Sequence, residues 1–257
     1  MKHLSNKRID RDAGFTLIEI AMVLAILGLV LGGLITAIGQ STENTRRSEA
    51  RALINRVEEA LYGFAQVTGY LPCPASDTSD GEEDRNTVTG VCNFNGGHGF
   101  VPAVTLGLQG RVNADGLLLD PWMNPLRYSV SLLESAPAGI PTFTSEEGMK
   151  LLFETPATLV AGPTLLRVCN AADCPTPDSV LADTVPAVVI SMGPNWATFT
   201  SADEVDNAGN VTEGGYRLTN TNTFVSRDYN PATYDDIITW LSPHVLLSRQ
   251  VMAGRLP

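Results

Sequence analysis

The 257-residue sequence lacks the short motifs that most often carry enzymatic chemistry. It contains no Gly-x-Ser-x-Gly elbow, no His-Glu-x-x-His zinc motif, no Walker loop and no dinucleotide fingerprint. Histidine is also scarce, because His3, His98 and His244 are the three in the chain and lie far apart in sequence. We therefore predict that the protein is not an enzyme and that none of these histidines is a metal ligand.

Positive charge is scarce as well. The chain has 17 Lys and Arg residues against 28 Asp and Glu residues, which gives a formal net charge of −11. Binding to DNA or RNA relies on clustered Lys and Arg that neutralise phosphates. The composition therefore predicts no nucleic-acid partner.

A short basic segment followed by a long apolar run dominates the N-terminal region. Residues 1–14 carry four Lys or Arg residues against two Asp residues, and residues 15–39 are almost purely apolar. About 20 apolar residues suffice for a helix to cross a bilayer, and a basic flank stays in the cytoplasm. We predict a basic leader over 1–14, a transmembrane helix over 15–39, and a C-terminal part outside the cytoplasmic membrane.

Glu19 lies near the start of this apolar run, where an ionisable side chain is costly and usually functional. Two simpler interpretations of the segment are a generic single-span anchor and a secretory signal peptide cut at Ala37-Ile38-Gly39. The run is longer than the ~7–15 residues typical of a signal peptide. Neither interpretation accounts for Glu19.

The hexapeptide Gly14-Phe-Thr-Leu-Ile-Glu19 resembles the processing site of type IV prepilins and of the pseudopilins of type II secretion. The resemblance implies that a prepilin peptidase cleaves after Gly14 and that Phe15 becomes the N-methylated first residue. A carboxylate in hydrocarbon favours a nearby cation, and the new amino terminus of a neighbouring subunit would supply one. Glu19 is therefore predicted to set the register of assembly.

Residues 40–68 continue the anchor as an amphipathic helix. Their apolar side chains recur at three- and four-residue steps, at Ala50, Leu53, Ile54, Val57, Ala60, Leu61 and Phe64. The helix is expected to end near Thr68-Gly69, ahead of two prolines.

Residues 69–257 are expected to form an exported globular domain, in which short apolar runs alternate with turn residues. The predicted strands are 126–133, 150–154, 165–168, 187–192, 197–200, 223–227 and 236–241. A C-terminal helix is predicted after the N-cap Ser242, with Val245, Leu246, Val251 and Met252 packed on the sheet. The predicted fold class is α+β and pilin-like, with a long N-terminal helix packed on an antiparallel sheet.

Four cysteines, Cys73, Cys92, Cys169 and Cys174, all lie in this predicted exported domain. An even number of cysteines in an oxidising compartment indicates two disulfides, for which three pairings exist. The two local pairs, Cys73–Cys92 and Cys169–Cys174, are favoured. Their spacing matches no strong zinc motif.

Two acidic segments, 200–210 and 234–240, are candidates for a calcium site, because Ca²⁺ prefers carboxylate and loop carbonyl oxygens. Segments 120–128, 190–195 and 235–240 are weakly similar to the C-terminal region of major pseudopilins, although Met123 replaces a glycine. That similarity implies a calcium-binding loop. The candidate ligands are Asp203, Asp206, Asp235 and Asp236, and a solvated acidic loop is the alternative.

Together these features predict a structural subunit of a type IV pilus or a type II secretion pseudopilus. Its expected partners are the prepilin peptidase, other pilin or pseudopilin subunits, the inner-membrane assembly platform and membrane lipid. The expected location is the bacterial inner membrane, single-pass with the N-terminus in the cytoplasm and the C-terminal domain in the periplasm. The alternatives are a minor pilin that binds a target at a fibre tip and a membrane-anchored periplasmic protein that does not polymerise.

Overall fold

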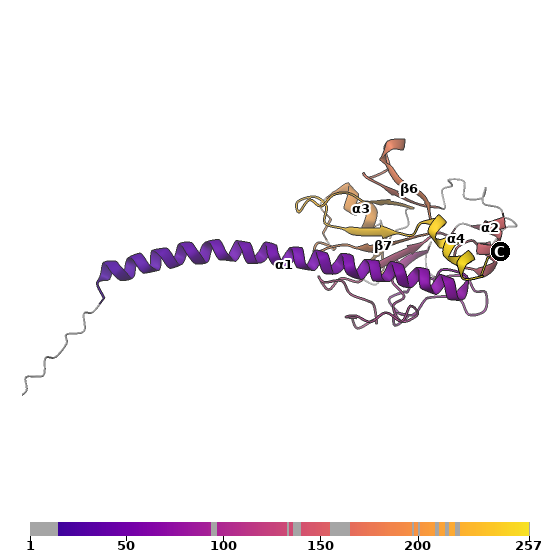
Figure 1. The fold of residues 1–257 in the computed structure, drawn as a ribbon, viewed down its shortest axis with the longest axis horizontal. Coiled ribbons are helices and arrows are strands. Elements are labelled where there is room, and N and C mark those ends of the chain that lie inside the picture. The colour runs from indigo at the N-terminus through magenta and orange to yellow at the C-terminus, as the bar shows by residue number, and fades with distance from the viewer. Residues whose placement is uncertain are drawn as a thin grey trace, which may run out of the picture. The chain divides into compact units, whose positions relative to one another are not determined.

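The computed structural model describes residues 15–93, 97–132, 134–135, 140–154, 165–196, 198–199, 201–208, 211–213, 216–218 and 222–256. Within them, the side chains of residues 31–38, 134–135, 211–213 and 216–218 are not described. The chain divides into two compact units, Met1–Thr45 and Arg46–Pro257. Helix α1, Leu17–Thr68, contributes to both units (Figure 1).

The second half of α1 belongs to the core of the larger unit. The apolar stripe that the sequence predicts is buried at Ala50, Leu53, Ile54, Val57 and Leu61, and Tyr62 and Ala65 extend it. The helix ends at Thr68, as its sequence predicts. Gly69 there adopts φ +89° and donates its N–H to Ala65 O at 2.8 Å, a helix end that glycine favours.

Two sheets belong to the same unit as the second half of α1. The first has the order β1 (His98–Phe100), β2 (Arg127–Val130), β7 (Ala187–Ser191), β11 (Ile237–Trp240), with every neighbouring pair antiparallel. The second has the order β10 (Thr223–Val225), β5 (Leu166–Cys169), β6 (Val180–Val185), in which β10 and β5 are parallel. Two short hairpins complete the strands, β3 (Glu134–Ser135) with β4 (Ile140–Pro141), and β8 (Val211–Glu213) with β9 (Tyr216–Leu218).

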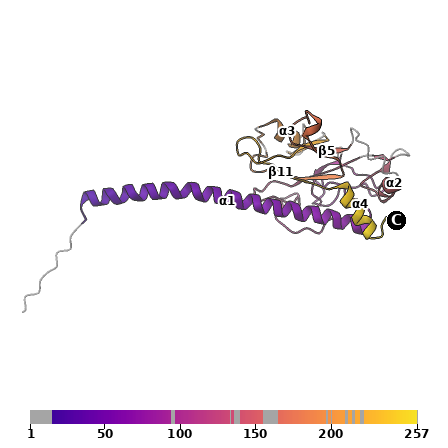
Figure 2. The same cartoon turned by 45° about the horizontal axis from the view of Figure 1, so that its top comes forward.

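The first sheet is covered on both faces. Val189 of β7 joins the core that contains α1, whereas its neighbours Val188 and Ile190 join the core that contains β5 and β10. Figure 2 shows β11 between α1 on one side and β5 with α3 on the other. Burial on both faces explains why all five residues of β7 are buried.

The predicted fold class, α+β with an N-terminal helix packed on an antiparallel sheet, is confirmed. Five of the predicted strands correspond to β2, β5, β7, β10 and β11. The prediction for 197–200 is not supported, because Thr198 and Phe199 are not in a strand and the two flanking residues lie outside the described part. Among the described residues, no helix combines the length and the apolar character needed to span a membrane, so the transmembrane prediction is not confirmed.

Two segments are helices where the sequence predicted other structure. Residues 150–154, predicted as a strand, belong to α2 (Glu146–Glu154), whose first turn is capped by the Ser145 hydroxyl accepting from Gly148 N–H at 3.0 Å. The acidic segment after residue 200, predicted as a loop, contains α3 (Ala202–Ala208). Ser201 Oγ accepts there from Glu204 N–H at 3.3 Å.

The predicted C-terminal helix is present as α4 (Pro243–Met252), but it does not pack as expected. Leu246 is buried, whereas Val245, Val251 and Met252 are exposed. Leu247 also packs against the core that contains α1. Polar contacts reach α1 as well: Ser242 N–H donates to Tyr62 Oη, Arg249 pairs with Glu59, and Gln250 Nε2 donates to Ala65 O. Ser242 therefore precedes the helix without capping it through its hydroxyl. A short 3₁₀ turn, η3 (Pro177–Ser179), precedes β6.

Candidate functional site

The predicted processing site is described only from Phe15 onward, because Gly14 lies outside the described residues. Glu19 lies in the first turn of α1, where its N–H donates to Thr16 O at 3.1 Å. Its side chain is exposed. The large apolar side chains that follow up to residue 30 are exposed too, and Phe15 and Leu17 reach 78% and 89% exposure. A continuous apolar surface of this kind marks a region that contacts a partner or lipid.

A buried turn brings together two of the three segments that resemble major pseudopilins, 120–128 and 190–195. Asp120 Oδ1 accepts from the N–H groups of Trp122 and Asn124, and its Oδ2 accepts from the Ser191 hydroxyl at 2.6 Å. Asn124 Nδ2 donates to Gly193 O at 2.6 Å. Burial raises the pKa of Asp120, and these hydrogen bonds partly offset the effect. Asp120 therefore acts as an internal brace that joins residues 120–124 to the end of β7.

The four predicted calcium ligands do not form one group. Asp203 Oδ1 accepts from Ala172 N–H at 2.8 Å and its Oδ2 pairs with Arg227, while Asp206 accepts from Asp173 N–H at 3.0 Å. These two aspartates therefore hold the loop closed by Cys169 and Cys174. Burial raises the pKa of Asp206.

The other two predicted ligands meet Glu204, which the sequence analysis did not select. Asp235 and Asp236 are 7% and 5% exposed, and Glu204 is fully buried. Asp235 N–H donates to Glu204 Oε1 at 3.3 Å, and Asn207 Nδ2 donates to Asp236 Oδ2 at 2.8 Å. We call Glu204, Asp235 and Asp236 the acidic cluster.

The acidic cluster is electrostatically strained. Burial, followed by the charge of Glu204, raises the pKa of Asp235 to about 7. Burial also raises the pKa of Asp236 well above its usual value. The buried Oδ1 atom of each of these aspartates has no hydrogen-bond partner in the described part. The same holds for Oδ1 of Asn195, whose Nδ2 donates to Glu204 Oε1. Such buried, unpaired oxygens are uncommon and call for a cation or proton.

A fully formed metal centre is not evident in the described part of the chain. Within it, no three or more His, Cys, Asp and Glu side chains are grouped so that they could hold a metal ion. His98 is buried on β1, where its Nδ1 lies 2.9 Å from Ser129 Oγ, and burial lowers its pKa to about 3. Any cation would have to draw on amide or carbonyl oxygens in addition to the acidic cluster.

The structure places the cysteines in two pairs at disulfide distance. Cys73 lies beside Cys92 with a Cα–Cα distance of 5.4 Å, and Cys169 lies beside Cys174 with 5.6 Å. These are the two local pairs that the sequence favours. Each would close a loop on the surface of the larger unit, at residues 73–92 and 169–174.

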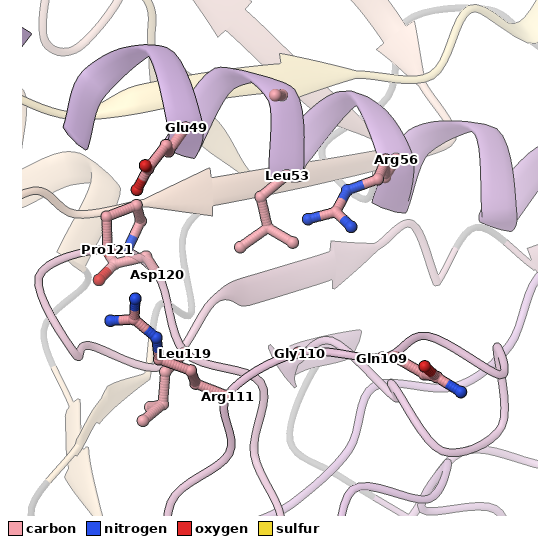
Figure 3. A pocket seen from close by; sticks show the side chains of 10 residues that line it. Glu49, Leu53, Arg56, Gln109, Gly110, Arg111, Leu119, Asp120 and Pro121 are labelled. Atoms are coloured by element: carbon pink, nitrogen blue, oxygen red, sulfur yellow. The ribbon is translucent and has the colours of Figure 1, made fainter. Parts of the chain in front are cut away.

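A groove of about 430 Å³ lies between α1 and the loop over residues 109–121. Its lining consists of Glu49, Ala52, Leu53, Arg56, Gln109, Gly110, Arg111, Leu119, Asp120 and Pro121. Figure 3 shows Leu53 and Arg56 entering from the helix and Arg111 from the opposite wall. The groove could not be predicted from the sequence, because its two walls are more than 50 residues apart in the chain.

Comparison with known proteins bears on the N-terminal region. No curated protein and no solved structure matches the chain. The prokaryotic N-terminal methylation motif matches residues 9–35, a stretch that contains Gly14, Phe15 and Glu19. The motif implies processing by a prepilin peptidase and points to a structural protein. The chain thus carries the signature of type IV pilins and pseudopilins.

Proposed function

We propose that this protein is a structural subunit that is cleaved after Gly14, N-methylated at Phe15 and assembled through α1 into a type IV pilus or a type II secretion pseudopilus. The observation that carries the proposal is the methylation motif at residues 9–35, located where α1 begins. Its partners would be the prepilin peptidase, other pilin or pseudopilin subunits, the inner-membrane assembly platform and membrane lipid.

The contrast between the two parts of α1 supports this proposal. The described side chains of residues 15–30 leave an apolar surface uncovered, whereas residues 50–65 bury their apolar stripe in the larger unit. The uncovered part suits insertion into lipid before assembly and packing against neighbouring helices afterwards. The periplasmic location of the larger unit follows from the same proposal, because the basic leader would stay in the cytoplasm.

Processing is tested by intact-mass and N-terminal peptide analysis of the membrane-extracted protein. The proposal expects a chain that begins with N-methylated Phe15. A chain that begins at Gln40 would instead mean cleavage by signal peptidase and would overturn the proposal.

The role of Glu19 is tested with Glu19→Ala. We expect normal cleavage but loss of incorporation into sheared fibres, because the variant cannot pair with a neighbouring amino terminus. Glu147→Ala, which removes an exposed glutamate from α2, is the matched control and should assemble normally. Normal incorporation of Glu19→Ala would refute the proposed pairing, and labelling confined to fibre ends would favour the tip-located alternative. A correctly processed chain found in no fibre would favour the non-polymerising anchor.

We also propose that the acidic cluster binds calcium. The unpaired Oδ1 atoms of Asp235, Asp236 and Asn195 support this, since Ca²⁺ accepts carboxylate and amide oxygens together. Asp203 and Asp206 are less suitable, because other groups of the protein already engage their oxygens.

The calcium proposal is tested by thermal melting with calcium and with chelator. At a hundredfold excess over its dissociation constant, calcium should stabilise the domain by about 2.7 kcal/mol. Asp236→Asn should abolish the shift and Asp206→Asn should keep it. Equal melting temperatures with calcium and chelator in the unsubstituted protein would rule out the site.

A further inference from the structure

The groove between α1 and residues 109–121 presents two arginines that lack an acidic partner. Arg56 and Arg111 are exposed, and neither forms an ion pair with a described residue. The Nη1 atom of Arg111 lies 3.7 Å from Met123 Sδ. Four other arginines of the larger unit do pair with carboxylates: Arg85, Arg167, Arg227 and Arg249. Acidic residues outnumber basic ones by 28 to 17, so an arginine without a carboxylate partner is unexpected in this chain. Two such arginines in one groove are available to bind an external anion.

The groove also has the apolar components of a protein-docking surface. Leu53, Leu119 and Pro121 line it, and Met123, whose sulfur accepts from Arg111 of the groove, is 54% exposed. Met123 adopts φ 71°, a left-handed conformation that is costly for a residue with a side chain. Backbone strain that keeps a side chain exposed is a reason to look for a function. Arginine and methionine are both enriched at protein interfaces.

A fitting acidic counterpart lies on the same chain, in a loop we call the acidic knob, residues 76–84. Its tip carries Asp77, Asp80 and Glu82, whose carboxylates form no ion pair with described residues. The loop is held by Ser79, whose Oγ accepts from Ser76 N–H at 3.0 Å and donates to Glu82 O at 2.7 Å. A preorganised loop loses little conformational entropy on binding.

We propose that the groove receives the acidic knob of a second copy of this chain, with Arg56 and Arg111 facing Asp80 and Glu82. The proposal rests on the proposed function, because assembly is what would bring copies together. The formal net charge of −11 becomes −13 when the leader, with four basic and two acidic residues, is removed, so copies repel each other and their association requires local contacts between opposite charges. A small free anion fits less well, since it would make no use of the apolar lining formed by Leu53, Leu119 and Pro121.

The first test places a photo-cross-linking residue at Gln109, an exposed position in the groove, in the full-length chain in its membrane. Mass spectrometry of the cross-linked product should identify residues 76–84 of a second copy. A cross-link to another protein or to a different segment, or no cross-link in preparations that contain fibres, would overturn the proposal.

The second test exchanges the charges between two differently tagged copies. Arg56→Glu with Arg111→Glu in the groove copy should lower the cross-link yield by about tenfold or more, which corresponds to about 1.4 kcal/mol. Asp80→Lys with Glu82→Lys in the knob copy should restore it. Arg51→Glu, an exposed position on α1 that does not line the groove, should leave the yield unchanged.

The outcomes separate this proposal from the function on which it rests. If fibres form and require Glu19, but charge reversal leaves the cross-link unchanged, the groove assignment is wrong and the assembly function stands. If the unsubstituted chain enters no fibre and gives no cross-link, both are wrong. Loss of the cross-link without rescue by the charge exchange also counts against direct pairing of groove and knob.

Discussion

Replacing Asp235 by Asn should stabilise the larger unit at neutral pH and have little effect in mild acid. Asp235 is 7% exposed, and its carboxyl lies near that of Glu204. Burial and the charge of Glu204 raise its pKa from 3.8 to about 7, and Arg47 offsets this only in part. Asn keeps the size of the side chain but removes the charge, so the variant avoids the cost of ionising this position.

The direction of the pH dependence follows from where the proton is held. The folded protein keeps a proton on Asp235 that the unfolded chain releases from about pH 4 upward. The stabilisation from this group is therefore fully present below pH 4 and is lost as the pH rises through 7. The full shift of about three pH units corresponds to at most about 4 kcal/mol at 1.36 kcal/mol per unit. Screening by solvent reduces this, and we expect about 1–2 kcal/mol between pH 5 and pH 8.

The assay is urea unfolding of a fragment that begins near Arg46, at several pH values and with chelator present. His98, whose pKa burial lowers to about 3, destabilises both proteins as the pH falls below about 6.5. The informative quantity is therefore the difference in unfolding free energy between Asp235→Asn and the unsubstituted fragment. A difference that stays constant from pH 5 to pH 8 would show that Asp235 does not titrate with a raised pKa.

Three further predictions concern separate parts of the structure and are tested by urea unfolding. Met123→Gly should stabilise the protein by about 0.5–1 kcal/mol because it relieves the left-handed conformation of an exposed residue, and any loss of stability would contradict this. Cys73→Ser with Cys92→Ser should cost about 2–5 kcal/mol if the pair is oxidised, and non-reducing peptide mapping should first detect the bridge. Gln250→Ala should cost about 1–3 kcal/mol of stability because it removes a buried hydrogen-bond donor to Ala65 O. Met252 is 82% exposed, so Met252→Ala should change stability by less than about 0.5 kcal/mol. Equal effects of the two variants would refute the packing of α4 on α1.

The second half of α1 could be predicted because the residues that it packs into the core are apolar at regular three- and four-residue steps. Positions 50, 53, 54, 57 and 61 are apolar and lie on one face of a helix, and the structure buries all of them. The strands β7 and β11 could be predicted for a related reason, since both are short apolar runs between turn residues. The partners of these strands could not be predicted, because pairing depends on contacts far apart in the chain.

The two short helices α2 and α3 escaped the sequence analysis for an identifiable reason. In α2 the run Leu151-Leu152-Phe153 reads as a strand, although Met149 and Leu152 are the buried pair, three residues apart. The signal that could have revealed both helices is a serine followed by acidic residues, at Ser145 and Ser201. Both helices have fewer than ten residues, too short for periodicity to outweigh composition.

The candidate ion site was only partly predicted, because the helix α3 places its neighbouring acidic residues on two different faces. A loop over the same residues would impose no such separation. In α3, Asp203 and Asp206 lie on one face, and Glu204 and Asn207 lie on another, at the same spacing of three residues. The first pair faces the loop over 169–174, and the second pair faces Asp235 and Asp236. Without the helix, nothing in the sequence favours Glu204 over Asp203.

Arg47 connects the acidic cluster to the helix through which we propose assembly. It lies near the start of the α1 segment in the larger unit, is 7% exposed, and its guanidinium stacks 3.3 Å from the centre of the Tyr229 ring. Its charge lowers the pKa of Asp235, so ionised Asp235 attracts Arg47 and protonated Asp235 does not. A proton or a cation at the acidic cluster would weaken the electrostatic attraction between Asp235 and Arg47, whereas the stacking of Arg47 on Tyr229 would remain. The attachment of this part of α1 to the domain should therefore depend on the ionisation state of Asp235, even though the apolar stripe that follows does not titrate.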